Sequence, residues 1–216
     1  MSSSVSAGPR LPAAERSAQL LDVARSVFAR DGYRGASMEA IAEAAGVTKP
    51  VLYQHFSSKH ALYSSLLESE IGELTAALVR AFDDAGGNEE RLRLGFSAYL
   101  GFVEAHEDAF RLLFTEGIGL DDAFQRRVSQ FREWVADRIT AIIRAEAGLP
   151  EARARALAVA IVGMAESAAT WWLGERRPLP IAELADELAG LAWKGFARFP
   201  SGIHEPDADV EHPRPA

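Results

Sequence analysis

Apolar residues recur at helical spacing along almost the whole chain, and none of its segments keeps the period-two alternation of a half-buried β-strand. Between residues 13 and 199 the sequence is rich in Ala, Leu, Glu and Arg, which are all good helix formers. We therefore predict an all-α fold of about nine helices. The predicted helices cover residues 15–30, 37–46, 48–56, 58–82, 89–105, 108–115, 121–147, 151–174 and 181–199.

The ends of the predicted helices carry residues that suit those positions. Asp31-Gly32 ends the first helix, because glycine accepts the left-handed conformation that often follows a helix. Ser37 and Thr48 are good N-caps for the second and third helices. Residues 1–12 are predicted to be a flexible arm and residues 200–216 a disordered tail, since both are rich in Pro and polar residues.

Residues 41–53 have the order of a helix-turn-helix: a short apolar helix, a turn that contains Gly46, and a second helix with an N-cap. In such a motif the second helix enters the major groove of DNA, with its N-terminal side chains nearest the bases. Lys49 could bond guanine and Gln54 could bond adenine, while Val51 or the Thr48 methyl group could touch a thymine methyl.

Other side chains near this motif suit contacts with the DNA backbone. Lys59 and His60 fall in the first turn of the fourth predicted helix, where the macrodipole disfavours cations unless an anion such as a phosphate is bound. The alternative is that Tyr53 and Phe56 belong to the core and that Lys59 is a solvated charge. The full predicted DNA-binding set is Ser37, Thr48, Lys49, Pro50, Val51, Tyr53, Gln54, His55 and Lys59.

The formal net charge of −8 seems at first to argue against a nucleic-acid partner. The charge is uneven, however. Residues 1–65 hold seven basic and five acidic groups, a balance of +2, which leaves −10 for the remainder. A small DNA-binding module attached to an acidic body would give this asymmetry.

Several classes of protein are disfavoured by what the sequence lacks. Without cysteine there is no disulfide or thiolate metal site, and the reducing cytoplasm is the expected compartment. No signal peptide is evident, and the apolar stretch at residues 156–165 is too short for a membrane span. No phosphate loop, GxSxG or HExxH is present, so neither an enzyme nor a cofactor is expected. Glu104, His106 and Asp108 are interpreted as a solvated turn and not as a metal site.

Four segments of the chain fit the pattern of one known family: FARDGY at residues 28–33, MEAIA at 38–42, AGVTK at 45–49 and LYQHFSSK at 52–59. Through them, residues 16–67 resemble the DNA-binding domain of the tetracycline-repressor (TetR) family. The chain departs from the family pattern at Pro50, where Gly or a small polar residue is common, and at Val51, where Thr or Ser is. Groove contacts at these two positions are therefore expected to differ.

The resemblance implies a two-fold dimer with an N-terminal DNA-binding domain, residues 13–60, and a C-terminal ligand-binding and dimerisation domain, residues 61–199. It implies a ligand-responsive repressor that binds a pseudo-palindromic operator and is released by a small, mainly apolar effector. The alternative is a ligand-binding or interaction module of the same fold that has lost DNA binding. The presence of Lys49, Tyr53 and Lys59 favours the repressor.

Two further sets of residues follow from the predicted C-terminal helices. Aromatic side chains concentrate there, and some are expected to line an effector cavity, although aromatic stripes are usually core. The predicted ligand-binding set is Leu67, Phe96, Tyr99, Phe114, Phe131, Trp134, Glu166 and Trp171, with Glu166 alternatively a paired or partly solvated carboxylate. The last two helices are expected to form the dimer interface through Ala158, Val162, Ala165, Ala169, Trp172, Leu184, Leu188 and Leu191, unless these stripes serve only the protomer core.

Overall fold

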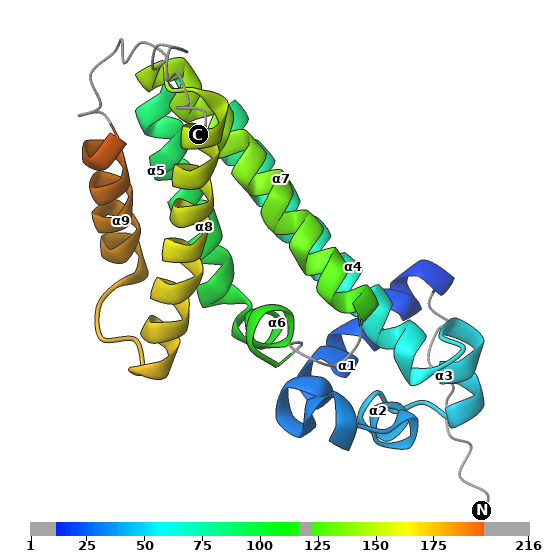
Figure 1. Ribbon diagram of the computed structural model, residues 1–216. Coiled ribbons are helices and arrows are strands. Elements are labelled where there is room, and N and C mark those ends of the chain that lie inside the picture. The colour runs from blue at the N-terminus through cyan, green and yellow to red at the C-terminus, as the bar shows by residue number, and fades with distance from the viewer. Residues whose placement is uncertain (1–11, 117–121, 197–216) are drawn as a thin grey trace, which may run out of the picture. The chain divides into compact units, whose positions relative to one another are not determined.

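The computed structural model describes residues 12–116 and 122–196, and all the secondary structure within these ranges is helical (Figure 1). This confirms the predicted all-α class. The elements are α1 (Ala13–Gly35), α2 (Met38–Ala44), α3 (Lys49–His55), α4 (Lys59–Asp83), α5 (Asn88–Ala105), α6 (Glu107–Phe110), the π-helix η1 (Arg111–Glu116), α7 (Asp122–Ala147), α8 (Glu151–Gly174) and α9 (Ile181–Phe196). The predicted helix at 108–115 is thus divided into α6 and η1. The predicted tail and all but the last residue of the predicted arm lie outside the described ranges.

The chain folds as two compact units, which are described separately. The first unit contains residues 1–80 and 101–131, and the second contains residues 81–100 and 132–216. The first unit is larger than the predicted DNA-binding domain of residues 13–60, because α6 and η1 return to contact α1. Helices α4, α5 and α7 each contribute residues to both units.

Helix α1 builds the core of the first unit with one apolar face. Leu20, Ala24, Val27 and Phe28 recur at helical spacing and are all buried. The regular helix is interrupted at Gly32, whose φ of 67° is readily adopted only by glycine, as the predicted helix end at Asp31-Gly32 requires. The chain can therefore turn from α1 into α2.

Aromatic rings from α1, α4 and α7 meet inside the first unit. We call Phe28, Tyr33, His60, Tyr63 and Phe124 the aromatic cluster. The centroid of the fully buried Tyr63 ring lies 5.0 Å from that of Phe28, 4.9 Å from that of Tyr33 and 4.9 Å from that of Phe124, while His60 stacks on Phe124 at 4.9 Å. Such pairs each contribute about 0.5–1.5 kcal/mol beyond the burial of their area. The cluster therefore ties the three helices together.

A buried ion pair also connects α1 with α4. Arg25 Nε donates to Oε1 of Glu70 at 2.6 Å, and the Glu70 side chain is almost completely buried. Burial raises the pKa of Glu70, and the hydrogen bond from Arg25 opposes that rise. Within the described residues Glu70 Oε2 has no hydrogen-bond partner. The carboxylate therefore depends on Arg25 for its stabilisation.

His106 lies in the predicted turn, between α5 and α6, and is also close to this ion pair. One ligand atom from each of Glu70, Glu73 and His106 lies within 4.8 Å of the others, so these three residues have the spacing of a metal-binding group. Glu104 and Asp108 are not part of it. The spacing of the turn alone could not indicate that His106 also lies close to two carboxylates of α4.

In the second unit α8 packs against α9. Trp172 is buried there and its Nε1 donates to the Leu179 carbonyl oxygen at 2.8 Å. Arg132 donates two hydrogen bonds to the Glu166 carboxylate, at 2.7 and 2.9 Å. Glu166 is therefore a paired carboxylate, which is the alternative that the sequence left open.

Helix α8 is long and apolar enough, by length and composition alone, to cross a membrane. The sequence prediction that the apolar stretch at residues 156–165 is too short for a membrane span rests on Glu166, which interrupts it. Less than a third of the most apolar part of α8 is buried inside the chain. One side of this helix therefore presents apolar side chains to its surroundings.

The ion pair between Arg25 and Glu70 gives a prediction about stability. Arg25→Leu should lower the free energy of unfolding by about 3–5 kcal/mol near pH 7, because it leaves a buried carboxylate without its cation. The loss should shrink towards pH 5. A carboxylic acid whose pKa is higher in the folded than in the unfolded state binds more protons when folded, so folding gains stability as the pH falls through that window.

Urea unfolding at the two pH values measures this effect. Arg144→Leu is the matched control, because Arg144 forms an exposed pair with Glu151 at 3.3 Å and should cost less than about 1 kcal/mol at either pH. An Arg25→Leu protein that is as stable as the wild type, or whose loss does not change with pH, would contradict the prediction.

Candidate nucleic-acid interface

Helices α2 and α3 form the predicted helix-turn-helix. Ser37 caps α2, since its Oγ accepts a hydrogen bond from the Ala40 N–H at 3.1 Å. The turn passes through Gly46 with a φ of 64°, and the Val47 N–H donates to the Ala42 carbonyl oxygen at 2.9 Å. Thr48 precedes α3 as its N-cap, without a side-chain capping bond. The local geometry is the one that residues 41–53 predicted.

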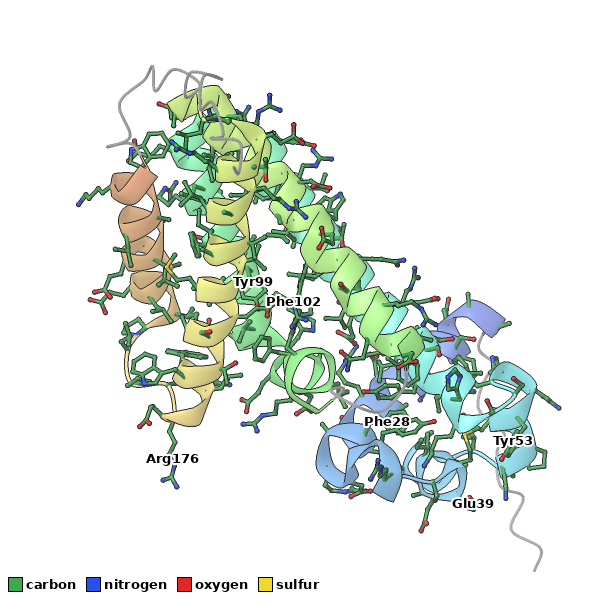
Figure 2. The ribbon with its side chains drawn as sticks, in the orientation of Figure 1. Phe28, Glu39, Tyr53, Tyr99, Phe102 and Arg176 are labelled. Carbon is green, nitrogen blue, oxygen red and sulfur yellow. The ribbon has the colours of Figure 1, made fainter. Side chains whose placement is uncertain are left out.

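Burial of one face of α3 decides which side chains point outwards. Leu52 is completely buried and Phe56, which follows the helix, is buried too. The opposite face is exposed, and Tyr53 keeps 42% of its surface accessible. Figure 2 shows Tyr53 on α3 and Glu39 on α2. The exposed predicted contacts are Thr48, Lys49, Pro50, Tyr53 and Gln54, while Ser37, Val51, His55 and Lys59 are half-buried. The alternative that Tyr53 and Phe56 are both core is thus wrong for Tyr53 and right for Phe56.

Lys49 at the start of α3 is held in place by its neighbours. Its Nζ donates to Glu39 Oε1 from α2 and lies 5.9 Å from the centroid of the Tyr53 ring. The hydrogen bond from Lys49 lowers the pKa of Glu39, and the same bond raises that of Lys49. Both side chains are largely exposed, so a phosphate or a base could compete with Glu39 for the ammonium group.

The far end of α3 is tied to the beginning of α1. His55 Nδ1 lies 2.9 Å from Ser17 Oγ, a hydrogen bond across 38 residues of sequence. A surface hollow of about 740 Å³ lies beside this contact. It is lined by Ala13, Arg16, Gly46, Val47, Thr48, Val51, Gln54 and His55. Arg16 therefore adds a cation to the predicted DNA-facing surface, although no feature of the sequence set it apart from other arginines of α1.

Lys59 makes contacts within the chain that the sequence did not predict. Its Nζ donates to the carbonyl oxygens of Tyr33 and Ala36, each at 2.8 Å, and lies 4.7 Å from the centroid of the Tyr33 ring. The last carbonyls of a helix lack partners within the helix, and a cation there also favours the macrodipole. Lys59 thus binds the carbonyl groups at the end of α1. The prediction considered only its position in the first turn of α4 and could not indicate this contact.

The predicted ligand-binding residues belong to two different units. Leu67, Phe114 and Phe131 are buried in the first unit, and Phe96 and Tyr99 are buried in the second. Burial, with Glu166 as a nearby negative charge, raises the pKa of Tyr99 well above its usual value. Trp134, Glu166 and Trp171 also lie in the second unit, with Trp134 half-buried, Glu166 paired to Arg132 and Trp171 48% exposed.

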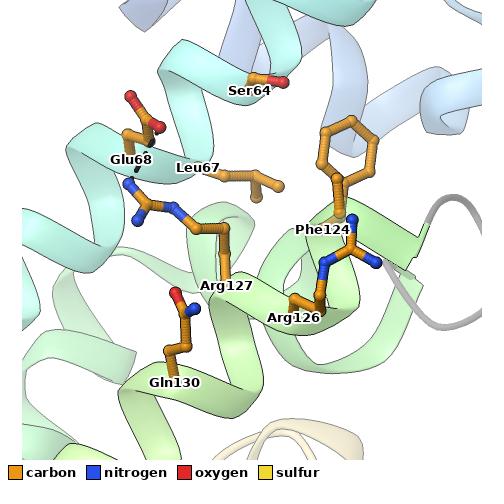
Figure 3. Close-up of a pocket in the computed structure, with 8 residues that line it drawn as sticks. Ser64, Leu67, Glu68, Phe124, Arg126, Arg127 and Gln130 are labelled. Atoms are coloured by element: carbon orange, nitrogen blue, oxygen red, sulfur yellow. Dashed lines mark hydrogen bonds and ion pairs between the residues drawn. The ribbon is translucent and has the colours of Figure 1, made fainter.

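One pocket of the first unit includes a predicted ligand residue. It has a volume of about 320 Å³ and lies between α4 and the first turns of α7 (Figure 3). Leu67 and Phe124 contribute its apolar surface. The other lining residues are Ser64, Glu68, Ala123, Arg126, Arg127 and Gln130.

The predicted dimer residues are mostly inside the protomer. Five of them are buried in the second unit, as the alternative of a protomer core requires: Ala158, Ala165, Ala169, Trp172 and Leu184. Val162 and Leu188 are half-buried, and Leu191 is 65% exposed. Trp172, which was predicted at the dimer interface, lies in the core, and Trp171, which was predicted to line the effector cavity, lies on the surface. Both faces of α8 are small and apolar, so the sequence pattern did not fix which face was outermost.

Comparison with known proteins agrees with this architecture. Residues 20–66 match the model of bacterial regulatory proteins of the tetR family, and residues 88–195 match the tetracyclin repressor-like C-terminal domain. The chain is 35% identical to the HTH-type transcriptional activator FasR of Mycolicibacterium smegmatis over 89% of this chain and 88% of that protein.

Solved structures give the same result. A TetR-like transcriptional regulator from Rhodococcus sp. RHA1 is 30% identical, with a TM-score of 0.76 over 88% of this chain and all of that one. FadR of Bacillus subtilis, solved with stearoyl-CoA, has a TM-score of 0.70 over 82% of this chain and 98% of that one, and at 18% identity it shows the fold alone. The molecule is thus a helix-turn-helix transcriptional regulator, a class that is not enzymatic. It belongs to the TetR family.

The contrast between the two lysines of the first unit leads to a prediction about folding. Lys59→Met should lower the free energy of unfolding by about 1.5–3 kcal/mol, because two carbonyl groups lose a charged donor. Lys49→Met should change it by less than about 0.5 kcal/mol, because Lys49 is exposed and its pair with Glu39 lies at the surface. Thermal and urea unfolding of the two variants measure both values, and equal losses would refute the assignment of Lys59 to the end of α1.

Proposed function

We propose that the protein is a dimeric, ligand-responsive repressor that binds a pseudo-palindromic operator and is released by a small, mainly apolar effector. The observation that carries the proposal is the exposed face of α3. Thr48, Lys49, Tyr53 and Gln54 are presented there on a helix whose opposite face is buried through Leu52. Each is a residue type that contacts bases or phosphates in a major groove.

The same face argues against a module that has lost DNA binding. Lys49 is exposed, and Arg16 lines the same surface hollow as Thr48 and Gln54. Both supply cations within a first unit whose N-terminal part is weakly basic, although the whole chain is acidic. Phosphate contacts from such residues give much of the affinity of DNA-binding proteins and make it fall with salt. An interaction module would have no need for this surface.

The proposed dimer uses the outer face of α8 together with α9. One side of α8 carries exposed residues that are small or apolar: Ala156, Val159, Ala160, Gly163, Ser167 and Trp171. Leu191 is exposed on α9. Contiguous apolar surface of this kind marks an association site, and small side chains permit close packing of helices across a two-fold axis. A partner chain would cover the apolar side of α8 that this chain leaves accessible.

The proposed effector is a mainly apolar molecule, with a fatty acyl derivative as the favoured class. The pocket lined by Leu67 and Phe124 supports an apolar ligand, and the fold is shared with FadR of Bacillus subtilis, which was solved with stearoyl-CoA. To release DNA, the effector must bind the DNA-incompetent state more tightly, because a ligand of equal affinity for both states shifts nothing.

Activation is the second candidate function, because the similar protein FasR of Mycolicibacterium smegmatis is an HTH-type transcriptional activator. The two functions share the operator contacts and differ in where the operator lies relative to the promoter. In vitro transcription from the chain's own promoter region, with and without the protein, separates them: fewer transcripts support repression and more support activation.

Operator binding is tested by fluorescence anisotropy with DNA from the region upstream of the protein's own gene and with an unrelated duplex. We expect tight binding to the first duplex only. Lys49→Met should weaken it and reduce the slope of log K against log salt by about one, because one phosphate or base contact is lost. Arg144→Met, which removes an exposed cation of the second unit, should bind as the wild type does. Equal, weak binding of both duplexes would support the module without DNA binding.

The dimer is tested with two matched variants. Ala160→Glu places a charge on the exposed apolar face of α8, and Ala141→Glu places the same charge at an exposed alanine of α7. We expect the first to shift the protein from dimer towards monomer, because a desolvated unpaired charge is costly, and the second to remain a dimer. Sedimentation velocity measures both. A dimer that tolerates Ala160→Glu, or a monomeric wild type, would overturn the proposed interface.

A further inference from the structure

The pocket between α4 and α7 combines an apolar wall with a cationic rim. Leu67 and Phe124 are both nearly fully buried and line it from opposite helices. In Figure 3 their side chains point into the space between the helices, with the guanidinium groups of Arg126 and Arg127 on either side. A purely apolar ligand would make no use of two arginines.

The rim has a net positive charge that an incoming anion could use. Arg126 and Arg127 are opposed by one carboxylate, Glu68, whose Oε1 lies 2.9 Å from Arg127 Nη2. Both members of this pair are more than half exposed, so water screens it and its contribution to stability is small. A ligand oxyanion could therefore replace Glu68 as the partner of Arg127 at little cost.

The other polar groups of the rim suit the same ligand. Guanidinium groups bind carboxylate and phosphate through paired N–H donors, and the side chains of Gln130 and Ser64 can add donors of their own. The volume of about 320 Å³ is enough for an anionic group and the first part of a chain. The apolar wall follows directly behind the cations.

We infer that this pocket binds the anionic end of an amphiphilic ligand, a phosphate or carboxylate group held by Arg126 and Arg127, with the adjoining apolar segment against Leu67 and Phe124. The inference deepens the proposed function, on which it rests for the identification of this ligand with the effector. Phosphate could come from an acyl thioester of coenzyme A or an alkyl phosphate, and carboxylate from a free fatty acid.

The experiment measures binding of stearoyl-CoA, dodecyl phosphate, laurate and the neutral dodecanol by calorimetry, each below its micellar concentration. The test variant is Arg126→Gln with Arg127→Gln, and the matched control is Arg144→Gln, which removes an exposed, ion-paired arginine of the same helix outside the pocket. We expect the double variant to bind at least one anionic probe tenfold or more weakly and dodecanol within about twofold of the wild type. Loss for the phosphate-bearing probes alone identifies phosphate, and loss for laurate alone identifies carboxylate.

The inference is overturned if the wild type binds no anionic probe, or if the double variant binds all of them as tightly as the control does. Equal weakening of dodecanol also overturns it, because the arginines would then act on the shape of the pocket and not on charge. Operator binding without any probe is measured on the same samples. If the protein binds the operator but none of the anionic probes, this ligand site is rejected and the proposed DNA-binding function stands.

Discussion

The end of α1 is the constraint on which the geometry of the first unit depends. The chain has to leave α1 at Gly32, turn and enter α2, and the Tyr33 and Ala36 carbonyl groups lie at this helix end. Lys59, at the start of α4, donates to both. One ammonium group therefore connects the end of the first helix with the beginning of the fourth, and α2 and α3 are enclosed between these two points. The direction of the exposed face of α3 follows from that closure.

The aromatic cluster and the Arg25–Glu70 pair secure the same two helices by different means. The packing of aromatic rings depends on contact area and shape and needs no charge. The ion pair needs both of its partners, because its carboxylate is buried. Neither contact involves the exposed face of α3. Residues on the surface that is expected to face DNA can therefore differ from the family pattern, as Pro50 and Val51 do. The aromatic cluster and the Arg25–Glu70 pair do not depend on them.

Helix ends and turns, which depend on residues close together in the sequence, could be predicted. Contacts between residues far apart in the sequence could not. Ser37, Gly32 and Gly46 mark the ends of elements through their own conformational preferences, and the helix-turn-helix was found from them. The bonds from Lys59 to the end of α1 were not predicted, because their acceptors lie more than 20 residues earlier in the sequence. The burial of Trp172 and the exposure of Trp171 were not predicted. Adjacent residues of a helix point about 100° apart, and both sides of α8 are apolar, so the sequence did not indicate which side faces the core.

Phe124 has two sets of contacts within the first unit, and this bears on how a ligand could influence DNA binding. Its ring forms part of the wall of the pocket and also packs on Tyr63 and His60 of the aromatic cluster. The cluster includes Tyr33, whose carbonyl group Lys59 holds. Packed interiors do not deform gradually, so a ligand that prefers a different position of the Phe124 ring favours a different packing of the cluster. That preference, and not the total affinity of the ligand, sets how far the orientation of α3 is shifted.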